Sequence, residues 1–194
     1  MWSFAAAVFF LIITPGPGVL SVAGVGSGFG FRAGLAYMAG LWAGNNLVAL
    51  AVVSGLAAFV FSIPYVREVL LGASLCYLVY LAAKIALAGS RIAFITSDSA
   101  PGVGNGIALQ AINPKAYAVN TTLFGGFAFM PDHLMAETLI KFALSNAIWI
   151  PAHFAWLYAG ASLKRLDVPE RTQRIINILM ALAMLLVVVL ALLS

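Results

Sequence analysis

The chain has 194 residues, of which 63% are hydrophobic and 8% are charged, and its mean hydropathy is +1.06. Soluble domains carry about 25% charged residues, so this composition excludes a water-soluble globular protein and indicates an integral membrane protein. The net charge of +4 comes from scattered basic residues rather than a nucleic-acid-binding patch, and the single cysteine excludes a disulfide framework or a CxxC redox pair.

Six apolar segments are long enough to cross a membrane, because a helix needs roughly 20 residues to span a hydrocarbon core of about 30 Å. We expect spans at residues 2–25, 35–60, 67–89, 106–130, 136–162 and 174–193. The first segment lacks a basic start and is longer than the apolar part of a secretory signal, so we expect it in the mature protein. The predicted fold is an all-α integral membrane protein with six transmembrane helices.

Two of these predicted helices contain helix-breaking motifs. The first is interrupted by TPGPG at residues 14–18, and the fourth by Asn113, Pro114 and Lys115. Unwound backbone at membrane depth is tolerated only where it is buried in protein or lines a water-filled cavity. We therefore expect the first and fourth helices to be broken, with the breaks facing a polar cavity.

Basic residues in the connections predict the orientation. The first, third and fifth connections hold most of them, above all KRLDVPERTQR at residues 164–174. The second and fourth hold Arg67 and Lys141, with acidic residues beside them. The positive-inside rule then places the odd-numbered loops in the cytoplasm and both termini in the periplasm.

The two halves of the chain, about 1–95 and about 100–194, echo each other. Each half has three predicted spans and a break in its first span, and Asn45 and Asn46 in the second span have a counterpart in Asn146. Because three spans is an odd number, the second copy must enter the membrane from the opposite side. Such inverted repeats are typical of secondary transporters, which hold substrate near the midplane. We expect one transporter domain, residues 1–194, that works by alternating access.

The breaks and the buried amides supply candidate substrate-binding residues. The half-helix after TPGPG begins with unpaired N–H groups and the positive end of a helix dipole, which suit a carboxylate. Lys115 is expected to attract that carboxylate or to bond carbonyls freed by the first break, unless it snorkels to the cytoplasmic edge. The candidates are Pro15, Gly16, Pro17, Gly18, Asn45, Asn46, Asn113, Pro114, Lys115 and Asn146.

Titratable groups at membrane depth are scarce. No Asp or Glu falls convincingly inside a predicted span, so the buried carboxylate of many proton-coupled carriers is not evident. His153 is the one imidazole at apparent depth, and a satisfied core histidine is the favoured interpretation of it over a coupling role. The chain offers no catalytic constellation and few metal-ligand types at depth, so we expect no enzyme activity, no cofactor and no metal site.

The motifs TPGPGVLSV, GFRAGLAYMAGLWAGN, GASLCYLVYLAAKI and NPKAYAVNTTLF occur in this order along nearly the whole chain. Together they resemble the LysE/RhtB family of bacterial amino-acid exporters. The resemblance implies an inner-membrane secondary carrier for basic amino acids or for neutral ones such as homoserine, threonine and leucine, driven by a proton or ion gradient. It also implies two inverted three-helix halves. Separately, the glycine-rich faces and the small size of the chain make a homodimer plausible.

Asn45 falls where the resemblance implies a polar or acidic residue, so proton coupling through this position and recognition of a cationic substrate both lose support. Without a buried carboxylate to pair with a cationic side chain, we expect small neutral or apolar amino acids as substrates. The alternative is export of another small solute or a metal ion on the same fold. The lipid bilayer is the expected environment, and nucleic acid is not an expected partner.

Overall fold

The computed structural model describes residues 1–14, 16–86, 99–165 and 169–193, and regular secondary structure in these ranges is helical throughout. The helices are α1 (Trp2–Ile13), α2 (Pro17–Phe29), α3 (Phe31–Val53), α4 (Leu56–Phe61), α5 (Val66–Ala86), α6 (Val103–Ile112), α7 (Pro114–Gly125), α8 (Leu134–Arg165) and α9 (Glu170–Leu193). The all-α prediction is confirmed for this part of the chain.

Both predicted helix breaks are present. Helices α1 and α2 lie on either side of the TPGPG motif and are bent by 49° relative to each other, while α6 ends at Ile112 and α7 begins at Pro114. The predicted span 35–60 is also divided, between α3 and α4. Gly55 explains this division, because it adopts a left-handed conformation with φ of 79° that suits glycine and ends a helix.

Helices of membrane type occur in the described ranges. By length and composition, Phe31–Val53 and Glu68–Ala86 can each cross a membrane, and α1 with α2 counts as a third span if the bent pair is taken as one. This finding supports a membrane protein and leaves the number of six spans as a prediction.

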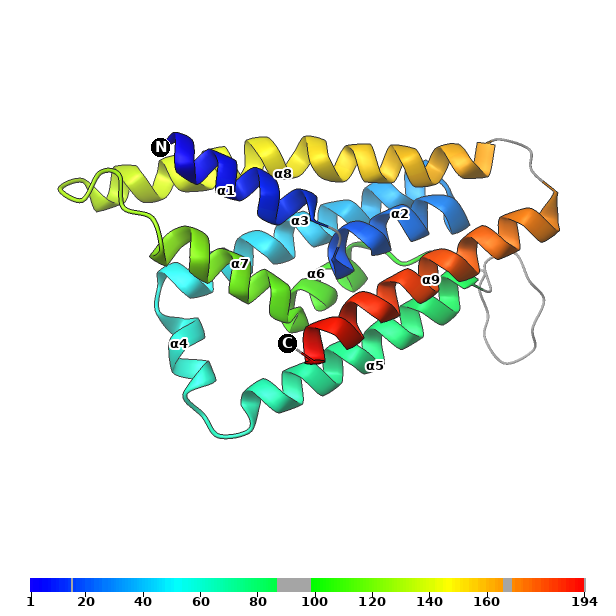
Figure 1. Ribbon diagram of the computed structural model, residues 1–194, viewed down its shortest axis with the longest axis horizontal. Helices are drawn as coiled ribbons and strands as arrows, with labels where there is room; N and C mark the ends of the chain where they lie inside the picture. The colour runs from blue at the N-terminus through cyan, green and yellow to red at the C-terminus, as the bar shows by residue number, and fades with distance from the viewer. Residues whose placement is uncertain (15, 87–98, 166–168, 194) are drawn as a thin grey trace.

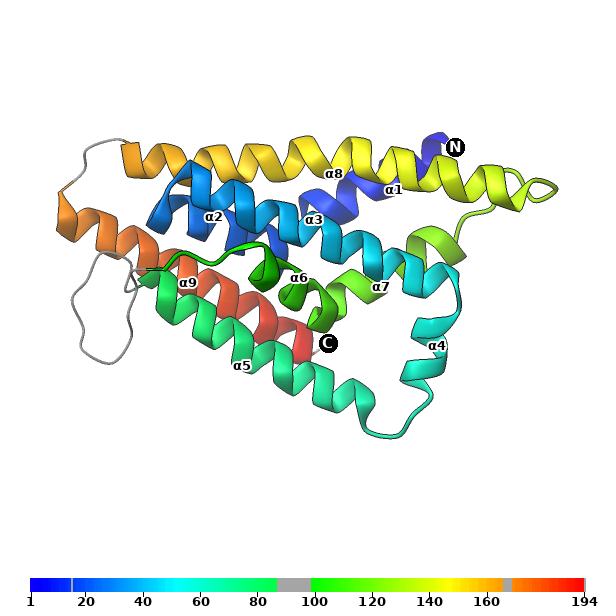
Figure 2. The same ribbon diagram turned by 180° about the vertical axis from the view of Figure 1, so that it is seen from behind.

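The helices form an elongated bundle. Helix α8 runs along one side, the pair α5 and α9 lies on the opposite side, and α2, α3, α6 and α7 lie between them (Figures 1 and 2). Helices α1 and α2 pack against α8, and α6 and α7 pack against α3. The N-terminus and the α7–α8 connection lie toward the same end of the bundle (Figure 1).

Glycines allow the central helices to approach each other closely. A Cβ at Gly106 in α6 would overlap the backbone of Tyr37 and Leu41 in α3, and a Cβ at Gly160 in α8 would overlap the Ala23 carbonyl in α2. In lipid, helix association depends on such close van der Waals packing, because apolar burial alone gives little gain. These crossings fix the broken helices beside the long ones.

A salt bridge fastens the α7–α8 connection. Glu137 and Lys141 lie one turn apart on α8 with 2.7 Å between Oε1 and Nζ. Glu137 also accepts from the N–H groups of residues 129–130, and Lys141 donates to the carbonyls of Phe124 and Phe127. The bond from Lys141 and those from the backbone lower the pKa of Glu137 to about 2, outweighing the opposite effect of burial.

Helix α8 is longer than the hydrocarbon core of a bilayer. Its 32 residues extend over about 48 Å, whereas the core is about 30 Å thick. At least one end of α8 therefore projects past the core, and we expect the first turn, which holds Glu137, to lie in the interfacial layer.

Candidate functional site

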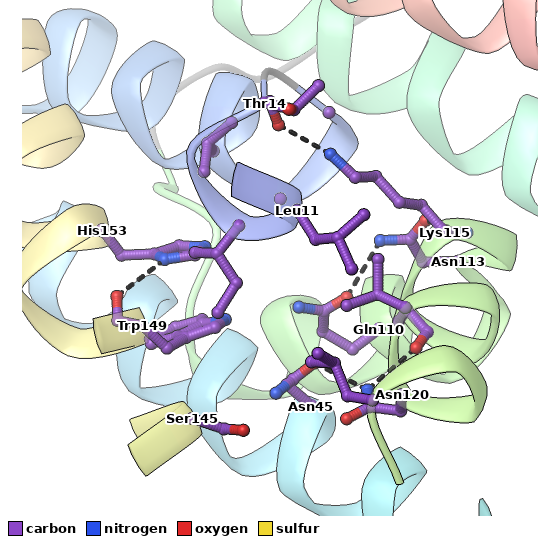
Figure 3. Close-up of a pocket in the computed structure, with 17 residues that line it drawn as sticks. Leu11, Thr14, Asn45, Gln110, Asn113, Lys115, Asn120, Ser145, Trp149 and His153 are labelled. Atoms are coloured by element: carbon purple, nitrogen blue, oxygen red, sulfur yellow. Dashed lines mark hydrogen bonds between the residues drawn. The ribbon is translucent and has the colours of Figure 1, made fainter. Parts of the chain in front are cut away.

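A cavity of about 60 Å³, with room for several water molecules, lies where the two helix breaks meet (Figure 3). Six helices or their ends contribute to its wall. The lining residues are Leu11, Ile12, Thr14, Gly16, Gly18, Val19, Asn45, Gln110, Asn113, Lys115, Ala116, Val119, Asn120, Leu123, Ser145, Trp149 and His153.

The first break leaves the start of α2 without a cap. Gly16 stands at the N-cap in an extended conformation and Pro17 occupies the first helical position, where its missing N–H is no loss. No side chain caps this end, and the first N–H bonded to the N-cap carbonyl is that of Leu20, 3.0 Å from the Gly16 oxygen. Among the described residues no side chain caps the N–H groups of Gly18 and Val19, which belong to the first turn, where a helix has donors without intrahelical partners.

The second break, by contrast, satisfies its own donors. Asn113 caps α7, since its Oδ1 accepts from the Lys115 N–H at 3.1 Å and its carbonyl accepts from the Ala116 N–H at 3.0 Å. The Asn113 Nδ2 in turn donates to Gln110 Oε1 at 3.0 Å. Of the two half-helix N-termini, the start of α2 is thus the one with donors to spare.

Lys115 joins the two breaks. Its Nζ donates to the carbonyl oxygen of Thr14, the C-cap of α1, over 2.6 Å (Figure 3). A Cβ at Gly16 would lie 2.8 Å from Lys115 Cδ, so a larger residue there would require the lysine side chain to shift. Of the roles expected for Lys115, the bond to a carbonyl freed by the first break is the one present.

The far wall of the cavity carries amides and a stacked imidazole. Asn120 Nδ2 donates to Asn45 Oδ1 at 3.2 Å, which joins α7 to α3. His153 stacks on Trp149 with 3.5 Å between ring centroids, and its Nδ1 lies 3.0 Å from the Trp149 carbonyl oxygen. Ser145 Oγ is buried and has no hydrogen-bond partner in the described structure.

Sequence reasoning missed Ser145 and Trp149. These two residues and His153 follow a spacing of four residues, which places all three on one face of α8. Asn and His were recognisable as polar groups at depth, but a serine and a tryptophan in an apolar segment are common. The regular spacing was the one signal that could have found them.

Most of the predicted site residues lie at the cavity or beside it. Gly16, Gly18, Asn45, Asn113 and Lys115 line the cavity. Pro17 and Pro114 begin the helices beside it, and Pro15 lies outside the described residues. The cavity thus brings together residues from both breaks, which are about a hundred positions apart in the chain.

Asn46 and Asn146 do not line the cavity. Asn146 Nδ2 donates to Asn46 Oδ1 at 2.9 Å, and Asn46 Nδ2 donates back to Asn146 Oδ1 at 3.1 Å. Trp42 Nε1 also donates to Asn146 Oδ1, at 2.6 Å. These amides bind each other across the α3–α8 contact, which is the structural alternative to a substrate role.

The lining of the cavity combines one basic side chain with an apolar wall. Lys115 is the one charged residue among those that line it, and Leu11, Ile12, Val119 and Leu123 form an apolar wall. Within the described ranges, no group of three or more His, Cys, Asp or Glu residues is placed to hold a metal ion.

Comparison with known proteins agrees with this description. The model of the family described as LysE type translocator matches residues 9–194. The chain is also 25% identical over 131 residues to the leucine efflux protein of Enterobacter sp. (strain 638), an alignment that covers 65% of this chain and 62% of that relative. The aligned part therefore spans less than two thirds of the relative's length. No solved structure matches the chain.

The family resemblance inferred from the motifs is thus confirmed by a match over nearly the whole chain. The match to a translocator family and the similarity to an efflux protein support a transporter rather than an enzyme. The protein belongs to the LysE type translocator family.

Proposed function

We propose that this protein exports small neutral or apolar amino acids from the cytoplasm across the bacterial inner membrane. The observation that carries the proposal is the uncapped start of α2, which faces a cavity with an apolar wall and no acidic lining residue. An amino acid offers the two groups that such a cavity can bind, a carboxylate and an apolar side chain.

The substrate carboxylate binds at the start of α2. No described side chain caps the N–H groups of Gly18 and Val19, which stand at the positive end of the α2 dipole. Gln110 adds a side-chain donor, because its Nε2 lies 3.7 Å from the position that a Cβ at Gly18 would occupy. Lys115 adds a positive charge nearby while its Nζ remains bound to Thr14.

The substrate side chain lies against the apolar wall. Leu11, Val119 and Leu123 offer no partner for a cationic side chain, and burial of an unpaired charge among them is costly. The similarity to a leucine efflux protein supports the same substrate class. Nothing in the described cavity favours a metal ion, the alternative that the sequence left open.

Two inverted repeats, about 1–95 and about 100–194, provide the transport cycle. The contacts between the halves support this, because the broken helices of each half pack on a helix of the other half. Helices α1 and α2 pack on α8, and α6 and α7 pack on α3. Six spans follow if each broken pair is one span and α3 with α4 is another. The halves rock around the shared cavity and open it to each side in turn, with both termini in the periplasm.

The homodimer expected from the glycine-rich faces and the small size of the chain remains a prediction.

A thermal-shift screen of the purified protein against the twenty amino acids tests this function. A ligand that binds only the folded state stabilises it by about 2.7 kcal/mol at a concentration one hundred times Kd. We expect leucine and similar side chains to raise Tm, lysine and glutamate to have no effect, and Lys115→Ala to weaken the response. The exposed His133→Gln serves as the matched control and should respond like the wild type. A folded sample that responds to no amino acid, or only to cationic ones, would contradict the proposal.

A further inference from the structure

Ser145 is a buried polar residue of the cavity wall whose hydroxyl is not used by the fold. The residue is 9% exposed, and its Oγ has no hydrogen-bond partner in the described structure. Its side chain lines the cavity and points into it (Figure 3). A buried hydroxyl without a partner costs free energy, so such a group in the wall of a binding cavity calls for a ligand that completes its hydrogen bonds.

Two amides at the same end of the cavity also have hydrogen-bonding atoms to offer. The next residues along α3 and α8, Asn46 and Asn146, are hydrogen-bonded to each other, so Asn45 and Ser145 lie at the same level of the bundle. Asn120 Nδ2 donates to Asn45 Oδ1 and to a backbone carbonyl of its own helix. These bonds leave Asn45 Nδ2 as a donor and Asn120 Oδ1 as an acceptor.

Ser145, Asn45 and Asn120 form a distal subsite, about two helical turns from the proposed carboxylate site. The start of α2 is level with His153, because a Cβ at Gly18 would lie 3.7 Å from His153 Nε2. Ser145 precedes His153 by eight positions on α8, which corresponds to about 12 Å along the helix. A hydrogen bond at each end takes up about 2.9 Å, so about 6 Å remain between the carboxylate oxygen and the far polar atom of a ligand.

This separation decides which group of an amino acid reaches the distal subsite. The ammonium is attached to the same carbon as the carboxyl group, so it stays near the start of α2. In an extended chain each bond advances about 1.25 Å, so five bonds span about 6 Å. Five bonds separate a carboxylate oxygen of asparagine from the oxygen or nitrogen of its side-chain amide. The group at the distal subsite is therefore the end of the side chain.

Charged side-chain ends fit the distal subsite poorly. An ammonium or a guanidinium would have no acidic partner, because Lys115 is the one charged residue that lines the cavity. A carboxylate would face the Asn120 Oδ1 acceptor and bury an unpaired negative charge. A neutral group that both donates and accepts avoids both costs.

We propose that the distal subsite binds the carboxamide of a neutral amino-acid side chain, and that Ser145 sets this specificity. The inference rests on the proposed function and narrows its substrate class. A carboxamide offers donors and an acceptor, which match the hydroxyl, the amide donor and the amide acceptor of the subsite. Leucine has nearly the same shape as asparagine but leaves all three side chains without partners, and a site built for hydrogen bonds discriminates against such an analogue.

The test compares the binding of asparagine and leucine to the purified protein by isothermal titration calorimetry in detergent. We expect the wild type to bind asparagine about two- to tenfold more tightly than leucine. Ser145→Ala removes the hydroxyl, and we expect it to lower this ratio of affinities by about two- to tenfold. Ser54→Ala, at the exposed end of α3, is the matched control and should keep the wild-type ratio.

Thermal unfolding without ligand separates this role from a structural one. Because the Ser145 hydroxyl has no partner in the described structure, Ser145→Ala should unfold at the wild-type temperature or above it. A clear decrease in Tm would mean that the hydroxyl serves the fold, and it would overturn the inference.

The wild-type comparison keeps the inference testable if Ser145→Ala does not fold. A wild type that binds leucine as tightly as asparagine would overturn it, and so would a wild-type ratio in Ser145→Ala. Binding of leucine alone would overturn the inference and leave the proposed function intact. A folded wild type that binds neither amino acid would instead refute the proposed function.

Discussion

Replacing Lys115 by methionine tests whether this lysine holds the two helix breaks together. Methionine keeps most of the length of the side chain but cannot donate to the Thr14 carbonyl, now 2.6 Å from Nζ. A hydrogen bond with a charged donor contributes about 1.5–3 kcal/mol, and about 1 kcal/mol shifts the Tm of a chain of this size by about 2–4 °C. We therefore expect Lys115→Met to lower Tm by roughly 3–12 °C.

The assay is thermal unfolding in detergent, followed by tryptophan fluorescence. Thr14→Val is the matched control, because it removes only the hydroxyl that donates to Phe10 and leaves the Thr14 carbonyl in place for Lys115. We expect a smaller decrease in Tm for this control. If Lys115→Met unfolds at the wild-type temperature, the lysine does not join the breaks. If its Tm is unchanged and leucine binding is lost, the lysine is a direct substrate ligand instead.

Three further predictions concern packing, amide pairing and pH. Gly106→Ala should destabilise the protein by about 1–3 kcal/mol or more, because its Cβ would overlap α3. The control is Gly104→Ala on the same helix, whose Cβ meets nothing within 4 Å and should leave Tm nearly unchanged. Equal effects of the two variants in thermal unfolding would contradict the α3–α6 crossing. Leucine at Asn46 and at Asn146 should give a coupling of about 0.6–1.7 kcal/mol in a double-mutant cycle of unfolding, and additive effects would show that the amides do not pair. Since the folded-state pKa of Glu137 is lowered to about 2, its ionised form stabilises the protein fully above its unfolded pKa of about 4.3, and this contribution is lost as pH falls toward 2. Tm between pH 5 and pH 2.5 should therefore fall more in the wild type than in Glu137→Gln, and parallel curves would refute the pairing.

Much of the fold could be predicted from local properties of the chain. Hydropathy and helix length located the apolar segments within a few residues. Proline located both breaks, together with glycine at the first, because these residues act on their own backbone. The division of α3 from α4 was missed, since a single glycine at position 55 in an apolar run is common inside membrane helices. The end points of helices depend on capping and packing, which hydropathy does not report.

The candidate site was predictable only in part. Asn45 and Asn46 are neighbours in sequence with the same side chain, yet only Asn45 lines the cavity. Consecutive residues of a helix point about 100° apart, so which of the two faces the cavity depends on how α3 is rotated against α7 and α8. That rotation follows from contacts such as those of Gly106, which the sequence does not specify by itself.

The sequence by itself determined that this is an all-helical membrane protein of the LysE type translocator family with two broken helices, because composition, hydropathy and motifs are properties of the chain. The tertiary structure decided what the breaks do. Only the fold brings Lys115 to Thr14, across 101 positions, and leaves the start of α2 open while Asn113 closes the start of α7. Whether a buried donor is satisfied depends on partners distant in sequence, and those partners are fixed by packing.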